Sequence, residues 1–278
     1  MTSTPRVVLD SLAFGESPRW HDGRLYVSDW GAGEVLALEA DGSTTVAARA
    51  QAFPLCFDFL PDGRMLLVAG MAVLRQESDG SLVTHTDLGR VWPTGANDIV
   101  VDDGGNAYVN TVGFDFPNAE YRPGSVGLVR PDGTAEVVAD GIAFPNGMAV
   151  SPDGATLLVA ESYGNVITAF DIGADGRLSG RRVWASLGED NPDGICVDAE
   201  GAVWYADVPH AHCIRVAEGG RVLQTVDLDR GGFACVLGGP ERRTLYVVTN
   251  QWGPQGPGEG RHSQVVAVEV EVPGAGHP

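Results

Sequence analysis

The sequence predicts an all-β fold, a six-bladed β-propeller that occupies residues 1–278 as one domain. Three observations support this fold. A unit of short apolar strands joined by Gly and Asp turns recurs about every 40 to 50 residues, which is the period of propeller blades. The chain contains 38 Gly and 17 Pro, which suits a turn-rich β protein. It shows no sustained 3.6-residue periodicity, so few helices are expected.

Each copy of the unit contains an apolar strand, a Pro/Asp/Gly turn, a second strand, a short polar turn and a third strand. One such sheet cannot bury both faces, whereas a ring of sheets can, and the ring also shortens exposed edges. The third copy carries a longer insertion. The segment RVVLDSLAF, residues 6–14, is expected to add a strand to the last blade and so close the ring. The copies begin at Ser17, Phe57, Asp98, Gly147, Gly194 and Cys235.

Composition excludes several classes of protein. The formal net charge is −19, whereas binding to nucleic acid needs a basic surface. There is no apolar run of about 18 residues, so no membrane span is expected, and the start MTSTPRVVLD does not read as a secretory signal. The four cysteines form no CxxC pair, which predicts structural thiols in a reducing cytoplasm. A closed ring needs no partner subunit, so we expect a monomer.

The residue just before the first strand of each copy is expected to lie near one mouth of the central channel. In four copies this residue is a carboxylate or an amide, and such oxygens converging from different blades suit Ca²⁺, Mg²⁺ or Mn²⁺. Any one of them alone is better explained as the cap of its own turn, but four at one equivalent position favour a site. The glycine that follows in PNG and PDG is interpreted as a turn residue. The six positions are Glu16, Cys56 (or Leu55), Asn97, Asn146, Asp193 and Ala234.

Several phrases resemble the senescence marker protein/gluconolactonase/luciferin-regenerating enzyme family, which includes regucalcin and bacterial sugar lactonases. They are GESPRW, GRLYVSDW, GANDIVVD, FPNGMAVSPDG, PDGICVDAEGAVW and GGPERRTLYVVTN, and they cover almost the whole chain. The resemblance implies a six-bladed propeller with one divalent metal at the channel mouth. It implies that Glu16, Asn146 and Asp193 bind this metal and that Asn97 lies near the metal's water and the substrate. The adjacent Asp98 is expected to brace the start of its strand.

The chain departs from the family at one position and resembles it more loosely at another. Sugar lactonases of the family usually carry Arg two residues before the Asn of the ND phrase, where this chain has Gly95. A substrate-contacting acid of the family aligns with Asp115, in the loop FDFPNAEYRPG. Phe114 and Tyr121 in this loop would make the pocket more apolar than a sugar needs. This loop is expected either to form part of a lid or to pack on itself at the surface.

The function expected from the resemblance is divalent-metal-dependent hydrolysis of a small lactone or ester. The metal would polarise the lactone carbonyl and activate water. Asp193 would accept the proton of the water, and Asn97 would orient the carbonyl or stabilise the oxyanion. Calcium is the first choice for the metal, with Mg²⁺, Mn²⁺, Fe²⁺ and Zn²⁺ left open.

Two other functions are compatible with the same residues: a non-hydrolytic biosynthetic enzyme that forms rings or condenses substrates, and a metal-holding binding protein.

Other polar side chains are weaker candidates for the site. His210 and His212 are interpreted as rim residues, one of which could touch substrate. Glu161, Ser162 and Asp207 end second strands and are interpreted mainly as turn acceptors.

Overall fold

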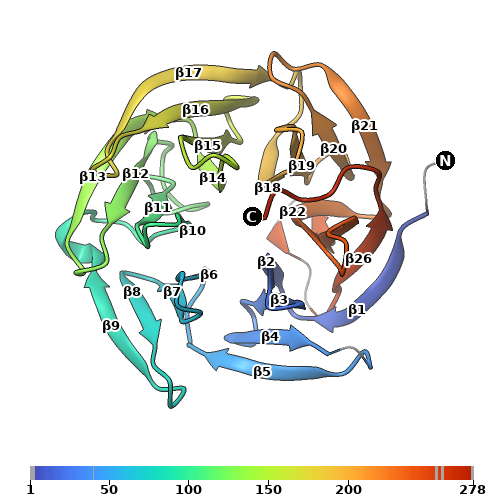
Figure 1. Ribbon diagram of the computed structural model, residues 1–278, viewed down its shortest axis with the longest axis horizontal. Helices are drawn as coiled ribbons and strands as arrows, with labels where there is room; N and C mark the ends of the chain where they lie inside the picture. Colours follow the sequence, from blue (N-terminus) through green and yellow to red (C-terminus); the bar gives the residue numbers. More distant parts are fainter. Residues whose placement is uncertain (1–3, 40, 254–255, 258–259, 277–278) are drawn as a thin grey trace.

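The computed structural model is a ring of six four-stranded antiparallel sheets around a central axis (Figure 1). It describes residues 4–39, 41–253, 256–257 and 260–276. In each blade the first strand lies nearest the axis and the fourth lies at the rim (Figure 1). This confirms the predicted all-β propeller.

Blades 1 to 3 follow one another along the chain. Blade 1 contains β2 (Gly15–His21), β3 (Arg24–Asp29), β4 (Glu34–Leu38) and β5 (Thr44–Arg49). Blade 2 contains β6 (Leu55–Phe59), β7 (Met65–Ala69), β8 (Ala72–Gln76) and β9 (Leu82–Asp87), and is followed by the short 3₁₀ helix η1 (Leu88–Arg90). Blade 3 contains β10 (Asp98–Val101), β11 (Ala107–Thr111), β12 (Gly124–Val129) and β13 (Ala135–Ile142).

Blades 4 to 6 complete the ring. Blade 4 contains β14 (Pro145–Val150), β15 (Thr156–Glu161), β16 (Val166–Ile172) and β17 (Leu178–Ser186). Blade 5 contains β18 (Pro192–Val197), β19 (Val203–Asp207), β20 (His212–Val216) and β21 (Val222–Asp227). Blade 6 contains β22 (Gly231–Gly238), β23 (Thr244–Asn250), β26 (Ser263–Glu269) and β1 (Arg6–Leu12). The two-residue strands β24 (Trp252–Gly253) and β25 (Gly256–Pro257) pair with each other.

Blade 6 joins the two ends of the chain. Its outer strand β1 comes from the N-terminal segment and pairs antiparallel with β26. The predicted closure of the ring by residues 6–14 is therefore confirmed. The pairing gives the last blade four strands, as in the other blades. As a result β26 lies between β1 and β23 and is hydrogen-bonded to a strand on each side.

Burial decreases from the axis to the rim. Every residue of β22 is buried, whereas the outer strand β17 is mostly exposed. Apolar side chains of neighbouring blades pack together, as where Ile195 and Tyr205 of blade 5 meet Ala149 of blade 4 in one cluster. All four cysteines are buried and free, as expected for structural thiols. In the part of the chain that the structure describes, no helix has the length and apolarity to cross a bilayer.

The glycines of PNG and PDG have a different role from the one the sequence suggested. Gly147 and Gly194 lie inside first strands, not in turns. A Cβ on Gly147 would lie 2.6 Å from the backbone oxygen of Asp193, and one on Gly194 would lie 2.5 Å from the Cα of Ala234. The first strands of neighbouring blades therefore approach so closely near the axis that no larger residue fits.

Candidate metal and substrate site

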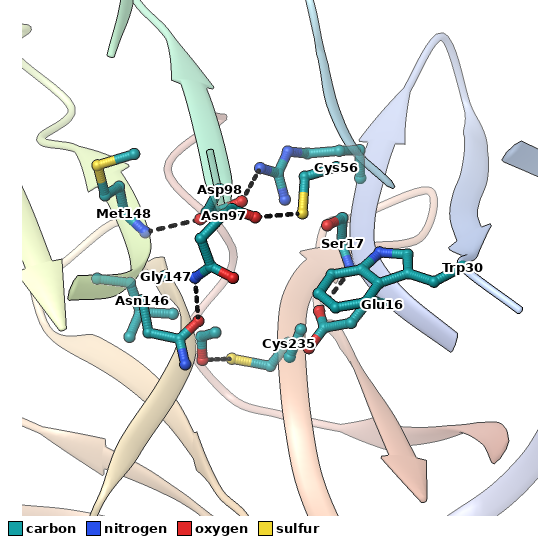
Figure 2. Close-up of a pocket in the computed structure, with 14 residues that line it drawn as sticks. Glu16, Ser17, Trp30, Cys56, Asn97, Asp98, Asn146, Gly147, Met148 and Cys235 are labelled. Carbon is teal, nitrogen blue, oxygen red and sulfur yellow. Dashed lines mark hydrogen bonds and ion pairs between the residues drawn. The ribbon is translucent and has the colours of Figure 1, made fainter. Parts of the chain in front are cut away.

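The four polar residues of the equivalent position are brought to one mouth of the channel by four different blades. Glu16 lies in β2, Asn146 in β14 and Asp193 in β18, and Asn97 directly precedes β10. Glu16, Asn97 and Asn146 line one cavity, together with Gly194 (Figure 2). The space in it that the centre of a water-sized sphere can occupy is about 20 Å³, which is room for one water or one ion.

Side-chain contacts link the members of this polar set. Asn97 Nδ2 lies 3.4 Å from Asn146 Oδ1 and donates to it. Asn146 Nδ2 donates to Ser162 Oγ at 3.3 Å, and that hydroxyl donates to the carbonyl of Pro192 at 2.7 Å. The side chain of Asn146 also hydrogen-bonds Asp193. The amide nitrogen of Asn146 therefore faces Ser162 and Asp193, and its oxygen faces Asn97.

Two acids at this mouth are held in an unfavourable environment. Burial, and then the charge of Asp98, raises the pKa of Glu16 to about 8. Burial, and then the charges of Glu16 and Asp98, raises the pKa of Asp193 well above its ordinary value. Among the described residues neither carboxylate forms an ion pair. A bound cation would remove this repulsion, so the oxygen donors of the set fit a hard divalent metal.

One arginine lies beneath the site and balances only part of its negative charge. The guanidinium of Arg19 is 3.4 Å from Asp58 and 3.8 Å from Asp98, and it donates to the carbonyl of Ile99 at 2.7 Å. Asp98 also accepts the backbone N–H of Met148, in the first strand of the next blade, at 3.2 Å. Asp98 thus braces β14 from the neighbouring blade, while Arg19 is committed to the two aspartates.

The other two equivalent positions carry no metal-binding oxygen in their side chains. Cys56 is buried, and its thiol donates to the backbone carbonyl of Asn97 at 2.8 Å. Leu55 is fully buried, and Ala234 lies against Gly194. These positions therefore support the polar set through packing and one hydrogen bond.

The acids that end second strands are turn acceptors, as interpreted from the sequence. Asp29 accepts the backbone N–H groups of Ala13 and Phe14, Glu161 accepts that of Ala143, and Asp207 accepts that of Asn191. In three blades the same position therefore holds the loop that leads into the first strand. The repetition shows that these acids position the ligand-bearing strands.

His210 lies in the turn between β19 and β20 of blade 5 and His212 is the first residue of β20, and both are next to two aspartates. Nδ1 of His210 is 3.1 Å from Asp207, and Nε2 of His212 is 3.2 Å from Asp190. The four side chains offer ligand atoms within 4.8 Å of one another. Hydrogen bonding to Asp207 raises the pKa of His210, whereas Nε2 of His212 is buried and has no hydrogen-bond partner among the described residues. This cluster is therefore a second set of possible metal ligands, apart from the polar set.

The loop after β11 places its three predicted residues in different surroundings. Phe114 is buried, Tyr121 is 45% exposed, and Asp115 is exposed, with its backbone carbonyl accepting the N–H groups of Asn118 and Ala119. The substrate role of these three residues stays a prediction.

At Gly95 the nearest atom to an added Cβ would be the oxygen of Gly70 at 3.5 Å, an ordinary contact. The lack of a side chain there is not imposed by space.

Sequence reasoning missed Trp30, which lines the cavity with Glu16 (Figure 2). Its indole N–H is buried and has no acceptor among the described residues. Trp30 directly follows Asp29 at the end of β3, as Ser162 follows Glu161 at the end of β15. The signal in the sequence is therefore the residue that directly follows each second strand.

Comparisons with known proteins identify the family and the fold. A family model described as the SMP-30/Gluconolactonase/LRE-like region matches residues 14–251. The chain is 26% identical to the 6-deoxy-6-sulfogluconolactonase of Pseudomonas putida, over 98% of this chain and 96% of the relative. It is 27% identical to the pentonolactonase XacC of Haloferax volcanii, over 90% and 85%. Among solved structures, a luciferin-regenerating enzyme matches with a TM-score of 0.84, at 20% identity and 97% coverage of both chains.

Proposed function

Since the chain belongs to the SMP-30/gluconolactonase/LRE-like family, we propose that it is a divalent-metal-dependent hydrolase of lactones. The observation that carries this proposal is the polar set at the channel mouth. Glu16, Asn97 and Asn146 line a space for one ion. The carboxylate of Asp193 interacts with Glu16 and Asn146, and neither Glu16 nor Asp193 forms an ion pair among the described residues. The lactonase activities named for two full-length relatives support the same reaction class.

Glu16, Asn146 and Asp193 are the residues that would hold the metal. Their donors are all oxygens, which favours Ca²⁺ and leaves Mg²⁺, Mn²⁺, Fe²⁺ and Zn²⁺ as alternatives. When bound, the metal supplies Lewis-acid polarisation of the lactone carbonyl and lowers the pKa of water. Asn146 is prepared for this role because Ser162 fixes its amide nitrogen and leaves its oxygen toward the site.

Asp193 and Asn97 are the proposed catalytic residues. A carboxylate beside the metal can accept a proton from the water that the metal would activate. Asp193 would take the proton of the attacking water and return it to the alkoxide that leaves when the ring opens. Asn97 would orient the carbonyl or stabilise the negative charge that develops on its oxygen. Asp115, Phe114 and Tyr121 would contact the rest of the substrate.

We also propose a monomer in a reducing compartment such as the cytoplasm. The four thiols are free and buried, as suits a reducing environment. The inner strands are paired and covered within the ring, so the fold needs no second copy to complete its sheets.

The test is proton release from a panel of lactones by purified protein, before and after chelation with EDTA and after each divalent metal is added back. We expect hydrolysis of at least one lactone that EDTA abolishes and a metal restores. Asp193→Asn should lose this activity, while Asp22→Asn should keep it, because Asp22 is an exposed acid at the other end of blade 1. If no lactone is hydrolysed with any metal, or if hydrolysis is unaffected by chelation, the proposal is wrong.

A further inference from the structure

Aromatic side chains surround the polar set on the side of the channel mouth. In three blades a phenylalanine stands two residues before the first-strand position, and in a fourth it stands one residue before. They are Phe14 before Glu16, Phe53 before Leu55, Phe144 before Asn146 and Phe233 before Ala234. A layer of aromatic rings therefore adjoins the layer of polar ligands on these blades.

The first aromatic cluster belongs to blades 1, 2 and 6. The ring of Phe14 stacks on Trp30 with centroids 5.2 Å apart and meets Phe233 edge-on at 5.4 Å. Phe53 packs edge-on against Trp30 at 5.1 Å and is 62% exposed. Trp30 connects this cluster to the cavity, because its indole lines the cavity beside Glu16.

The second aromatic cluster belongs to blades 3 and 4. Phe144 stacks on Tyr163 with centroids 4.6 Å apart and meets Phe116 edge-on at 5.2 Å. Phe114 meets Phe116 and Tyr121 edge-on at 5.9 and 5.7 Å. Tyr163, Tyr121 and Phe116 are 51%, 45% and 40% exposed.

The two clusters stand on opposite sides of the channel mouth. In a ring of six, blade 1 faces blade 4 across the axis (Figure 1), so Phe14 and Phe144 approach the polar set from opposite directions. Exposed apolar rings gathered at one place mark a binding site, and the protein has a net charge of −19. The negative charge also disfavours anionic ligands, and a lactone ring carries no charge of its own.

We propose that the substrate is a neutral lactone bearing an aromatic or flat apolar group, which the two clusters hold while its ester group lies at the polar set. Trp30 determines this specificity: its ring contacts the apolar group, and its unpaired N–H donates to an ester oxygen. Trp30 suits both tasks because it belongs to the first cluster and to the cavity lining, and its N–H has no acceptor among the described residues. This inference rests on the proposed lactone hydrolysis.

Three six-membered lactones test the inference: dihydrocoumarin, which has a fused benzene ring; δ-valerolactone, which has none; and glucono-δ-lactone, which has hydroxyl groups instead. We expect kcat/KM to be highest for dihydrocoumarin and lowest for glucono-δ-lactone. Trp30→Leu and Tyr163→Leu should each lower kcat/KM for dihydrocoumarin at least about 10-fold, the scale of one lost apolar contact. Tyr163→Leu should leave kcat/KM for δ-valerolactone within about 2-fold of the wild-type value, because this small lactone would not reach the second cluster.

Conservative variants separate the ring from the N–H. Tyr163→Phe keeps the ring and should keep the preference for dihydrocoumarin. Trp30→Phe keeps a ring but removes the donor, so it should slow dihydrocoumarin and δ-valerolactone by the same factor. Equal effects of the leucine variants on both lactones, or faster hydrolysis of glucono-δ-lactone than of dihydrocoumarin by the wild type, would overturn the inference and leave lactone hydrolysis intact.

A binding measurement decides the inference even if no lactone is hydrolysed. The two lactams 3,4-dihydro-2(1H)-quinolinone and δ-valerolactam have the shapes of dihydrocoumarin and δ-valerolactone but resist ring opening. We expect calorimetry to show at least about 10-fold tighter binding of the aromatic lactam to the metal-loaded wild type, and a much smaller ratio for Trp30→Leu. The same ratio in both proteins would refute the aromatic site. If Trp30→Leu loses the preference for the aromatic lactam and no lactone is hydrolysed by any form of the protein, only the proposed hydrolase activity is refuted.

Discussion

Replacing Glu16 with glutamine should make the metal-free protein more stable at high pH. Glu16 is 8% exposed, and burial and the neighbouring Asp98 raise its pKa from 4.5 to about 8. The unfolded chain releases the Glu16 proton near pH 4.5, whereas the folded chain keeps it until about pH 8. Stability therefore falls as pH rises through this interval, because the folded state binds more protons than the unfolded state.

The size of the effect follows from the pKa shift. One pKa unit corresponds to roughly 1.4 kcal/mol, so the unfolding free energy of the metal-free wild type should fall by roughly 4 kcal/mol between pH 5 and pH 8 through Glu16 alone. Glu16→Gln keeps the shape of the side chain and removes this titration. It also removes the largest charge that raises the pKa of Asp193, so the variant should depend on pH even less.

The assay is urea unfolding in EDTA from pH 5 to pH 8, for the wild type and Glu16→Gln side by side. Subtracting the two curves cancels the contribution of groups that do not interact with Glu16, such as His210. We expect similar stability near pH 5 and a growing advantage for the variant toward pH 8. Added Ca²⁺ should raise the stability of the wild type at pH 8 by roughly 3 kcal/mol at 100 times its Kd and that of the variant far less. Parallel curves in EDTA would refute the reasoning.

Three further outcomes are expected. Asp193→Asn should lower kcat for the best lactone by at least about 100-fold with an unchanged circular dichroism spectrum; retained activity would remove it as the proton acceptor. Arg19→Met should lower the unfolding free energy by about 3–5 kcal/mol, because it removes the cation beside Asp58 and Asp98, whose side chains are only 6% and 13% exposed. Urea unfolding at pH 7 measures this loss, and a value below about 1 kcal/mol would contradict the ion-pair geometry. The double variant His210→Ala with His212→Ala should still bind one Ca²⁺ per chain by calorimetry. Loss of that ion would show that the metal binds in the cluster of these two histidines with Asp190 and Asp207.

The propeller and its closure were predictable because they depend on features that repeat along the chain. Alternating apolar strands and regular turns determine the blades, and the apolar segment at 6–14 had no blade of its own to join at its end of the chain. The convergence of Glu16, Asn97, Asn146 and Asp193 was predictable for the same reason, since equivalent positions in a closed ring point to one axis. The family match agrees with the resemblance that these phrases carry.

Features that depend on contact between different repeats were less accessible. Gly147 and Gly194 looked like turn residues because a single repeat does not show that the next blade lies 2.6 or 2.5 Å from a Cβ. Trp30 and Tyr163 belong to different copies and follow strands of their own blades. Only the ring closure shows that they stand in two aromatic clusters around one polar centre.

The closure of the ring also sets when the site can form during synthesis. The backbone N–H of Gly15, next to Glu16, donates to the hydroxyl of Ser263 at 3.0 Å, a residue 248 positions later in β26. A nascent chain that ends before β26 can carry every proposed metal ligand and still lack the neighbour that anchors the first of them. Metal affinity should therefore appear only when translation is almost complete. The ion would then selectively stabilise finished molecules, and partly made chains in the cell would not compete for it.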